Sequence, residues 1–454
     1  MPKNSIATKR EVKNHESMTT DMHTDRELFA SELRTMLREA LQVAMAGSYS
    51  SHAENSYFYT RKAYPMFTEV DNLPLFPQDI PEVLIKWAGL DSCLRRNDRE
   101  SRNNKESTNG TESRNNKESR NGTESRNDGE CRIDKEEILF LDLETTGLGR
   151  GDILAFMIGL GYYENEQFIV EQIFLPDPDA EVNSFDRLID LLQRKSLLIT
   201  FNGKTFDVPV LESRLLYHQL WLNLRSMEHL DLLHIARRLW KRKLPSCALE
   251  TIEFYVLGHI RDKELDIEGR EIPQTYFQYL INGDPELVRR IFIHNHADIL
   301  HTAALFTLIC DSIDYPPPHG MDIRIDYHAL ALLYKSQNHP ETAKRILIDL
   351  LASGVLSADI ARDLGLLYKQ EKDLVSATDC FAIAADLACP VAMLELAKLQ
   401  ENHHKAYPEA LLTAEKLQCY LLSRYVVETK KVAQVELRIE RLRKKINKAN
   451  PPKG

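Results

Sequence analysis

The sequence predicts an α/β domain with a mixed sheet flanked by helices, followed by an all-α domain of helical repeats. The first observation is that short apolar strand patterns alternate with amphipathic helical patterns over residues 136–311. The second is that residues 325–447 are helical in pattern throughout and contain a recurrence of 34 residues. A polar segment over residues 100–131 stands apart from both regions.

The α/β pattern begins with three apolar strand segments and continues with a helix, a fourth strand and a second helix. In order these are ILFLDLE at 138–144, then 152–163, 167–175, the helix 184–194, the strand 196–201 and the helix 206–219. A long helical pattern over 285–310 contains one or two helices, and the prolines at 316–318 close the domain.

The helical region repeats small and large residues at matching positions. Tyr334, Ala343 and Leu347 recur 34 residues later as Tyr368, Ala377 and Phe381, and Ala331 is matched by Gly365. A weaker third copy contains Ala397, Ala410 and Ala414. This period and these positions resemble the tetratricopeptide repeat, although generic helical hairpins give a similar pattern.

The first 99 residues predict an arm that contains one amphipathic helix over 26–46, and then an extended aromatic and proline-rich stretch over 50–92. Residues 100–131 repeat a twelve-residue unit that has no large apolar side chain. Such a segment cannot bury enough surface to offset its ordering entropy, so we expect a disordered insertion; an interaction tail is the alternative.

Composition limits the compartment and the class of protein. The formal net charge of −10 provides no global basic field for nucleic acid, so a nucleic-acid enzyme would need a local basic surface. The seven cysteines contain no C-x-x-C pair and predict buried thiols in a reducing compartment. No apolar run reaches the ~18 residues that a spanning helix needs, so we expect a cytoplasmic protein without membrane contact.

Four carboxylates and a histidine form the candidate catalytic set. Asp142 and Glu144 lie two apart at the end of an apolar strand, so both point to one face. Asp207 follows the next buried strand, at a junction where α/β sheets place their sites. Asp298 lies in the late helix, and His294 stands four residues earlier on the same helical face.

Each of these residues alone has an ordinary explanation as a cap, a turn residue or a surface ion-pair partner. Together, however, they fit two Mg²⁺ or Mn²⁺ ions, which prefer carboxylate oxygens. Two such ions ~4 Å apart can stabilise the attacking and the leaving oxygen of a phosphodiester. We therefore expect the four carboxylates as metal ligands and His294 as the general base.

The region 138–310 resembles the YprB-like family of ribonuclease H-like exonucleases, a branch of the DEDD (DnaQ-like) 3′–5′ exonucleases. The matching segments are FLDLETTGL, LITFNGKTFDVPVL, HLDLLHIARRLWKRKLPSCALETIE, IPQTYFQYLINGD and HNHADILHTAAL. By position, the resemblance implies that Asp142, Glu144, Asp207 and Asp298 bind the metal ions and that His294 is the base.

The position of the histidine departs from the family pattern. In the DEDDh group a histidine precedes the last aspartate by five residues, and in the DEDDy group a tyrosine precedes it by four. Here a histidine stands at the four-residue spacing, and Ile293 stands where relatives carry tyrosine. His301 and His296 are the alternative bases; His301 can share the face of Asp298, whereas His296 should point elsewhere.

Candidate substrate contacts surround these acids. Thr145 opens the TTGLG turn, where backbone can approach a ligand, and Asn202 and Lys204 lie in the turn before Asp207. The candidate phosphate contacts are Arg237, Arg238 and Lys241, in a basic run around Trp240 that equally suits a solvated helix face. No base-reading motif is visible, so we expect little sequence specificity.

The leading hypothesis is a 3′–5′ exonuclease that acts on a single-stranded nucleic-acid end, with a protein partner on the helical repeats. The alternative is an interaction scaffold whose nuclease fold is weak or inactive. The lack of H-x-H, H-E-x-x-H and cysteine clusters argues against a zinc enzyme.

Overall fold

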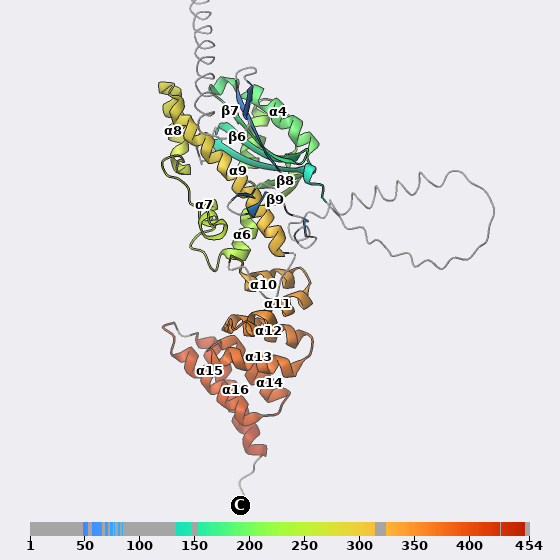
Figure 1. Cartoon of the computed structure of the whole chain (residues 1–454). Coiled ribbons are helices and arrows are strands. Elements are labelled where there is room, and N and C mark those ends of the chain that lie inside the picture. Colours follow the sequence, from blue (N-terminus) through green and yellow to red (C-terminus); the bar gives the residue numbers. More distant parts are fainter. Residues whose placement is uncertain are drawn as a thin grey trace, which may run out of the picture. The chain divides into compact units, whose positions relative to one another are not determined.

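A computed structural model describes residues 133–147, 153–313, 324–426 and 428–449, together with short stretches between 49 and 84 (Figure 1). These residues form two compact units, one built around a sheet and the other formed mainly by the C-terminal helices. The amphipathic helix expected over 26–46 and the insertion expected over 100–131 lie outside the described residues.

A seven-stranded mixed sheet organises the first unit, in the order β1-β2-β7-β6-β5-β8-β9. Its strands are β1 (Tyr49–His52), β2 (Phe58–Pro65), β5 (Ile138–Thr145), β6 (Ala155–Glu164), β7 (Gln167–Phe174), β8 (Leu197–Thr200) and β9 (Glu228–Asp231). Strands β5, β6 and β7 form an antiparallel meander, whereas β8 and β9 run parallel to β5. The predicted mixed sheet is confirmed, and the N-terminal arm adds β2 antiparallel to β7.

Helices cover both faces of the sheet. On one face, Leu139, Leu141 and Leu143 of β5 share a core with α4 (Glu181–Arg194) and α5 (Asp207–Tyr217). On the other face lie α8 (Ile272–Asn282) and α9 (Pro285–Ile313). Phe140 of β5 meets Phe306 of α9 with ring centroids 5.9 Å apart. Because strand side chains alternate, Asp142 and Glu144 also point to the face that α9 covers.

The 29-residue α9 is one continuous helix, and it crosses the sheet in Figure 1. The segment before it contains α6 (Leu232–Trp240), α7 (Leu249–Ile252) and the π-helical turn η4 (Glu253–Leu257). Gly258 ends η4 with a φ of 78°, a left-handed conformation that glycine adopts without steric cost. The minor elements are β3 (Glu69–Val70), β4 (Leu73–Pro74), η1 (Lys135–Glu137), η2 (Pro178–Ala180), η3 (Leu224–Ser226) and η5 (Gly269–Glu271).

The second unit is helical throughout its described residues. Its helices are α10 (Tyr327–Ser336), α11 (Pro340–Ala352), α12 (Ala358–Gln370), α13 (Leu374–Asp386), α14 (Pro390–Asn402), α15 (Tyr407–Leu422) and α16 (Thr429–Ala449). A Cβ at Gly365 of α12 would lie 2.8 Å from a ring carbon of Phe381 on α13, so only glycine lets these helices approach so closely. The predicted C-terminal helical region is therefore confirmed, while its assignment to the tetratricopeptide repeat stays a prediction.

Within the described part of the chain, no helix combines the length and the apolar character that crossing a membrane requires.

Candidate active site

The predicted carboxylates gather at one edge of the sheet. Because β5, β8 and β9 are parallel, their carboxyl ends meet there. Asp142 and Glu144 belong to the last half of β5, and Asp207 is the first residue of α5. The backbone N–H of Leu143, between the two β5 acids, donates a 3.1 Å hydrogen bond to Oδ1 of Asp207. This bond ties Asp207 directly to the strand that carries the other two acids.

Helix α9 brings the remaining predicted residues to the same place. The side chain of Asn295 donates a 2.8 Å hydrogen bond to Oδ2 of Asp142. One turn apart on the helix, His294 Nε2 lies 3.5 Å from Oδ2 of Asp298. The structure therefore brings together the four acids and the histidine that the sequence singles out.

Burial and mutual repulsion shift the acids strongly. Burial, followed by the charge of Asp298, raises the pKa of Asp142 to about 7. Burial and the charge of Asp142 also raise the pKa of Glu144 and of Asp207 well above their ordinary values. Several carboxylates that resist ionising next to one another form a site that a cation would stabilise.

His294 is held by an acid that the sequence did not single out. Its Nδ1 lies 2.9 Å from Oδ1 of Asp266. Burial opposes ionisation of Asp266, but the hydrogen bond with His294 and its charge, the backbone hydrogen bond from Ile267 and the charge of Arg261 together lower the pKa of Asp266. An ionised carboxylate can only accept, so Nδ1 carries the proton and Nε2 is left on the side of Asp298.

The pKa of His294 is far from its ordinary value. Burial by itself disfavours the charged ring, but the charge of Asp298, the hydrogen bond with Asp266 and the charge of Glu144 raise the pKa to about 10. In the absence of metal ions the ring therefore holds both of its protons at neutral pH. The cause is the excess of negative charge around the ring.

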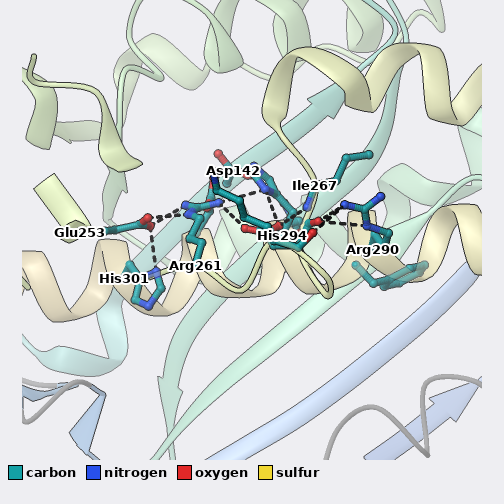
Figure 2. A network of polar contacts seen from close by, with 12 residues as sticks. Asp142, Glu253, Arg261, Ile267, Arg290, His294 and His301 are labelled. Carbon is teal, nitrogen blue, oxygen red and sulfur yellow. Dashed lines mark hydrogen bonds and ion pairs between the residues drawn. The ribbon is translucent and has the colours of Figure 1, made fainter. Parts of the chain in front are cut away.

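Arg261 is the principal residue that sequence reasoning missed (Figure 2). Its Nε and Nη2 each donate a 2.6 Å hydrogen bond to Glu253, and Nη2 also donates a 2.5 Å bond to Oδ1 of Asp298. Its Nη1 lies 3.2 Å from Oδ2 of Asp266 and 2.9 Å from Nδ1 of His294. One guanidinium thus connects the π-helical turn, the loop before α8 and the acidic end of the site.

The two alternative histidines have other partners. His301 Nδ1 lies 2.8 Å from Oε1 of Glu253, on the far side of Arg261 in Figure 2. His296 is buried and shares a 2.6 Å hydrogen bond with the hydroxyl of Tyr64 on β2, and burial lowers its pKa to about 3. Neither arrangement favours these rings over His294 as the base.

The chemistry of these carboxylate side chains suits a hard divalent cation, but their positions in this structure do not form a complete binding site. Among the described residues, no three His, Cys, Asp or Glu side chains are placed to hold one metal ion. Arg261 and His294 lie against the two oxygens of Asp298, and Asn295 contacts one oxygen of Asp142. Carboxylate oxygens are the ligands that Mg²⁺ and Mn²⁺ prefer, so the residues suit these ions once Asp298 exchanges a partner.

The predicted substrate residues lie around the same edge. Asp231, at the end of β9, accepts hydrogen bonds from the backbone N–H groups of Asn202 (2.8 Å) and Lys204 (3.1 Å). Asn202 has a φ of 72°, and both side chains of this turn are exposed. Thr145 is buried, and its hydroxyl donates to the carbonyl of Gly147.

The basic residues lie at the other end of α6. Asp231 caps the start of this helix by accepting from the N–H of Leu233 at 3.0 Å. Arg237 and Arg238 are exposed more than one turn further along, and Lys241 follows the last residue of the helix. The helix thus separates these side chains from the turn that precedes Asp207.

Three comparisons with known proteins found similarities to this chain. A model of the RNase H superfamily matches residues 139–310. The protein YprB of Bacillus subtilis (strain 168) is 31% identical over 319 residues, which cover 69% of this chain and 76% of YprB. A family B DNA polymerase from the hyperthermophilic archaeon Pyrobaculum calidifontis has 11% identity and a TM-score of 0.30; the match covers 52% of this chain and 29% of the polymerase. The chain thus spans less than a third of that polymerase's length.

Proposed function

The chain belongs to the family of Bacillus subtilis YprB and contains an RNase H superfamily domain, and on this basis we propose that it is a divalent-metal-dependent nuclease. The single observation that carries the proposal is the gathering of Asp142, Glu144, Asp207 and Asp298 at one sheet edge, three of them with raised pKa values. A set of converging acids destabilises a fold unless a cation offsets their charge.

The reaction is hydrolysis of a phosphodiester from a 3′ end, with Asp142, Glu144, Asp207 and Asp298 holding two Mg²⁺ or Mn²⁺ ions. Bound ions would supply charge stabilisation for the attacking and the leaving oxygen. Once bound cations lower the pKa of His294, its Nε2 would accept the proton of the attacking water, while Asp266 accepts a hydrogen bond from the protonated Nδ1.

A single-stranded end is the substrate we favour because the turn that contains Glu253 carries exposed aromatic side chains. Phe254 and Tyr255 are 51% and 54% exposed, and they belong to the same π-helical turn as Glu253. Glu253 is two hydrogen bonds from Asp298, through Arg261. Unpaired bases stack on exposed aromatic rings, whereas bases inside a duplex cannot reach them.

The helical unit would bind a protein partner. Its support is the 34-residue recurrence and the close approach of Gly365 to Phe381, a small-against-large contact typical of tetratricopeptide hairpins. Such hairpins commonly present a surface that receives a peptide or a helix.

The test is cleavage of end-labelled single strands of DNA and RNA by the full chain, with Mg²⁺, with Mn²⁺ and with EDTA. A 3′ label should appear first as a mononucleotide, whereas a 5′ label should appear in a ladder of shortening strands. A circular single strand should remain intact. The Asp207→Asn variant is the matched control, because it keeps the shape of the side chain but loses a carboxylate. Equal cleavage by wild type and D207N, or cleavage in EDTA, would reject the proposal.

A further inference from the structure

A row of residues runs across four neighbouring strands toward Asp142. In the register of the sheet, Thr60 of β2 is opposite Gln172 of β7, Gln172 is opposite Gly159 of β6, and Gly159 is opposite Asp142 of β5. Gly159 has no side chain, so it leaves a gap in the row between Gln172 and Asp142. The amide of Asn295, from α9, fills this gap.

Hydrogen bonds join the row through that amide. Gln172 Nε2 donates to the carbonyl of Phe292 at 2.9 Å and to Oδ1 of Asn295 at 3.0 Å. Asn295 Nδ2 then donates to Oδ2 of Asp142 at 2.8 Å. A Cβ at position 159 would lie 2.4 Å from Oδ1 of Asn295, so any larger residue would displace the amide. Gln172 and Asn295 are both fully buried.

The donor-to-acceptor direction of these hydrogen bonds is set at the Phe292 carbonyl, the end most distant from Asp142. A backbone carbonyl can only accept, so the carbonyl of Phe292 requires the NH₂ group of Gln172 to face it. The second hydrogen of the same NH₂ group requires Asn295 to present its oxygen, which leaves the NH₂ group of Asn295 for Asp142. The hydroxyl of Thr60 is compatible with this orientation, since it can donate to Oε1 of Gln172 at 3.4 Å.

We propose that Asn295 and Gln172 are positioning residues for Asp142. They fix Oδ2 as a hydrogen-bond acceptor and leave Oδ1 as the oxygen that a divalent cation can bind. The proposal rests on the proposed function in one respect, namely that Asp142 is a metal ligand. Residues that orient a metal ligand in this way typically change metal affinity by about 10–100-fold when they are replaced.

The substitution Gln172→Glu should reverse the donor-to-acceptor direction of these hydrogen bonds, although residue 172 does not itself contact Asp142. A carboxylate at 172 cannot donate to Asn295, so the amide of Asn295 must turn its NH₂ group toward residue 172. Its oxygen then faces Asp142, where two acceptors repel each other unless Asp142 takes up a proton or moves. Either outcome weakens cation binding without touching a proposed ligand.

The first measurement needs no metal ion. In the full chain with ¹⁵N-labelled asparagine, the side-chain amide of Asn295 should show one proton shifted strongly downfield by its bond to a carboxylate. The Asp142→Ala variant should lose this shift. In Q172E the NH₂ group of Asn295 donates to the new carboxylate at position 172 instead, so a downfield shift should remain when Asp142→Ala is added to Q172E. A shift that Asp142→Ala does not change in the otherwise wild-type protein would overturn the positioning role, whatever the activity of the protein.

The second measurement is Mn²⁺ binding by titration calorimetry. The dissociation constant should rise about 10–100-fold in Q172E and in Asn295→Ala, and it should stay unchanged in Thr60→Val, where only the 3.4 Å contact is lost. Excess Mn²⁺ should restore the cleavage rate of Q172E. If Q172E fails to fold, N295A decides the matter. Wild-type affinity in a folded variant would overturn the proposal, whereas absence of Mn²⁺ binding by the wild type, with the amide shift present, would reject the proposed function instead.

Discussion

Arg261 donates a hydrogen bond of 2.5 Å from Nη2 to Oδ1 of Asp298, so a largely buried guanidinium occupies one oxygen of a proposed metal ligand. The same Nη2 group also contacts Oε1 of Glu253 at 2.6 Å. Glu253 has a side chain that is only 1% exposed, and its position depends on Arg261 and His301. Arg261 therefore stabilises a buried acid and, at the same time, sets the position of Asp298.

Replacing Arg261 by glutamine should destabilise the sheet-containing first unit by about 3–5 kcal/mol, because Glu253 would remain as a buried charge without its main partner. The double variant Glu253→Gln/Arg261→Gln should recover much of this loss, since neither charge is left alone. Urea unfolding of both variants measures the difference. The matched control is Arg270→Gln, whose pair with Glu268 is exposed and should contribute less than ~1 kcal/mol. Equal stability of R261Q and R270Q would show that the buried network contributes nothing.

Stability without metal ions should fall as pH rises through neutrality. The pKa of Asp142 is about 7 in the folded chain, above its ordinary value of ~3.9 in an unfolded chain. A raised pKa contributes stability that is complete below the unfolded value and is lost as pH rises through the folded value. His294 acts in the same direction, from ~6.5 up to its folded pKa of about 10.

The variant Asp142→Asn isolates this contribution. Its melting temperature should exceed that of the wild type at pH 8 and approach it at pH 4, whereas Asp186→Asn, on the exposed side of α4, should follow the wild type. Added Mg²⁺ should raise the wild-type melting temperature more at pH 8 than at pH 5, because protonated acids bind cations poorly. Parallel profiles for wild type and D142N would contradict the assigned pKa.

The sequence predicts those features that a local pattern encodes. The period of two in ILFLDLE places three leucines in one core and both acids on the opposite face, as observed. The long apolar period of α9 predicts its helix, although not that 285–313 is a single one. Strand β9 was missed because it has four residues, of which only the last two are buried.

The supporting residues of the site could not be predicted because their roles exist only in three dimensions. Arg261 and Asp266 lie in a loop with no periodic pattern, which Arg290 of α9 fixes by donating to the carbonyl of Asp266 at 3.0 Å. In the sequence, Asn295 is an ordinary polar helix residue. Its role follows only from the register of the sheet, which places Gly159 against its amide and next to Asp142. Nothing in the sequence near either position indicates these partners.

Metal ions should lower the pKa of His294. In their absence Asp298 and Glu144 contribute to the value of about 10, and divalent cations on these acids would cancel that negative field. The ring resonances of His294, followed by NMR titration with and without Mg²⁺, measure the shift. With Mg²⁺ present, His294→Gln should reduce the cleavage rate by about 10²–10⁴-fold, while His234→Gln, exposed on α6, should not change it. If Mg²⁺ does not change the pKa of His294, the ring does not sense the charge of the bound ions and is not part of the metal site.

The exposed aromatic pair should affect substrate affinity more than the chemical step. Replacing Phe254 and Tyr255 by alanine should raise KM for a single strand, at a cost of about 1–3 kcal/mol for each base that stacks, with kcat nearly unchanged. Trp221→Ala is the control, since this ring is 85% exposed and belongs to a different segment. Equal effects of the two substitutions on KM would mean that the π-helical turn has no special place in binding.

The basic end of α6 should control the salt dependence of binding. If Arg237 and Lys241 each contact a phosphate, the double variant Arg237→Gln/Lys241→Gln should weaken binding of every sequence alike. The slope of log affinity against log salt should become shallower by about 1.4, because each lost contact with a single strand releases ~0.7 fewer counterions. A charge-matched control is Lys430→Gln/Lys444→Gln, which removes two exposed lysines from α16. The two double variants remove the same net charge from the chain, so a general electrostatic effect would change both slopes equally. A shallower slope in the α6 variant alone would indicate that the nucleic-acid strand binds along α6. Equal slopes in the two double variants would indicate that Arg237 and Lys241 only form a solvated helix face.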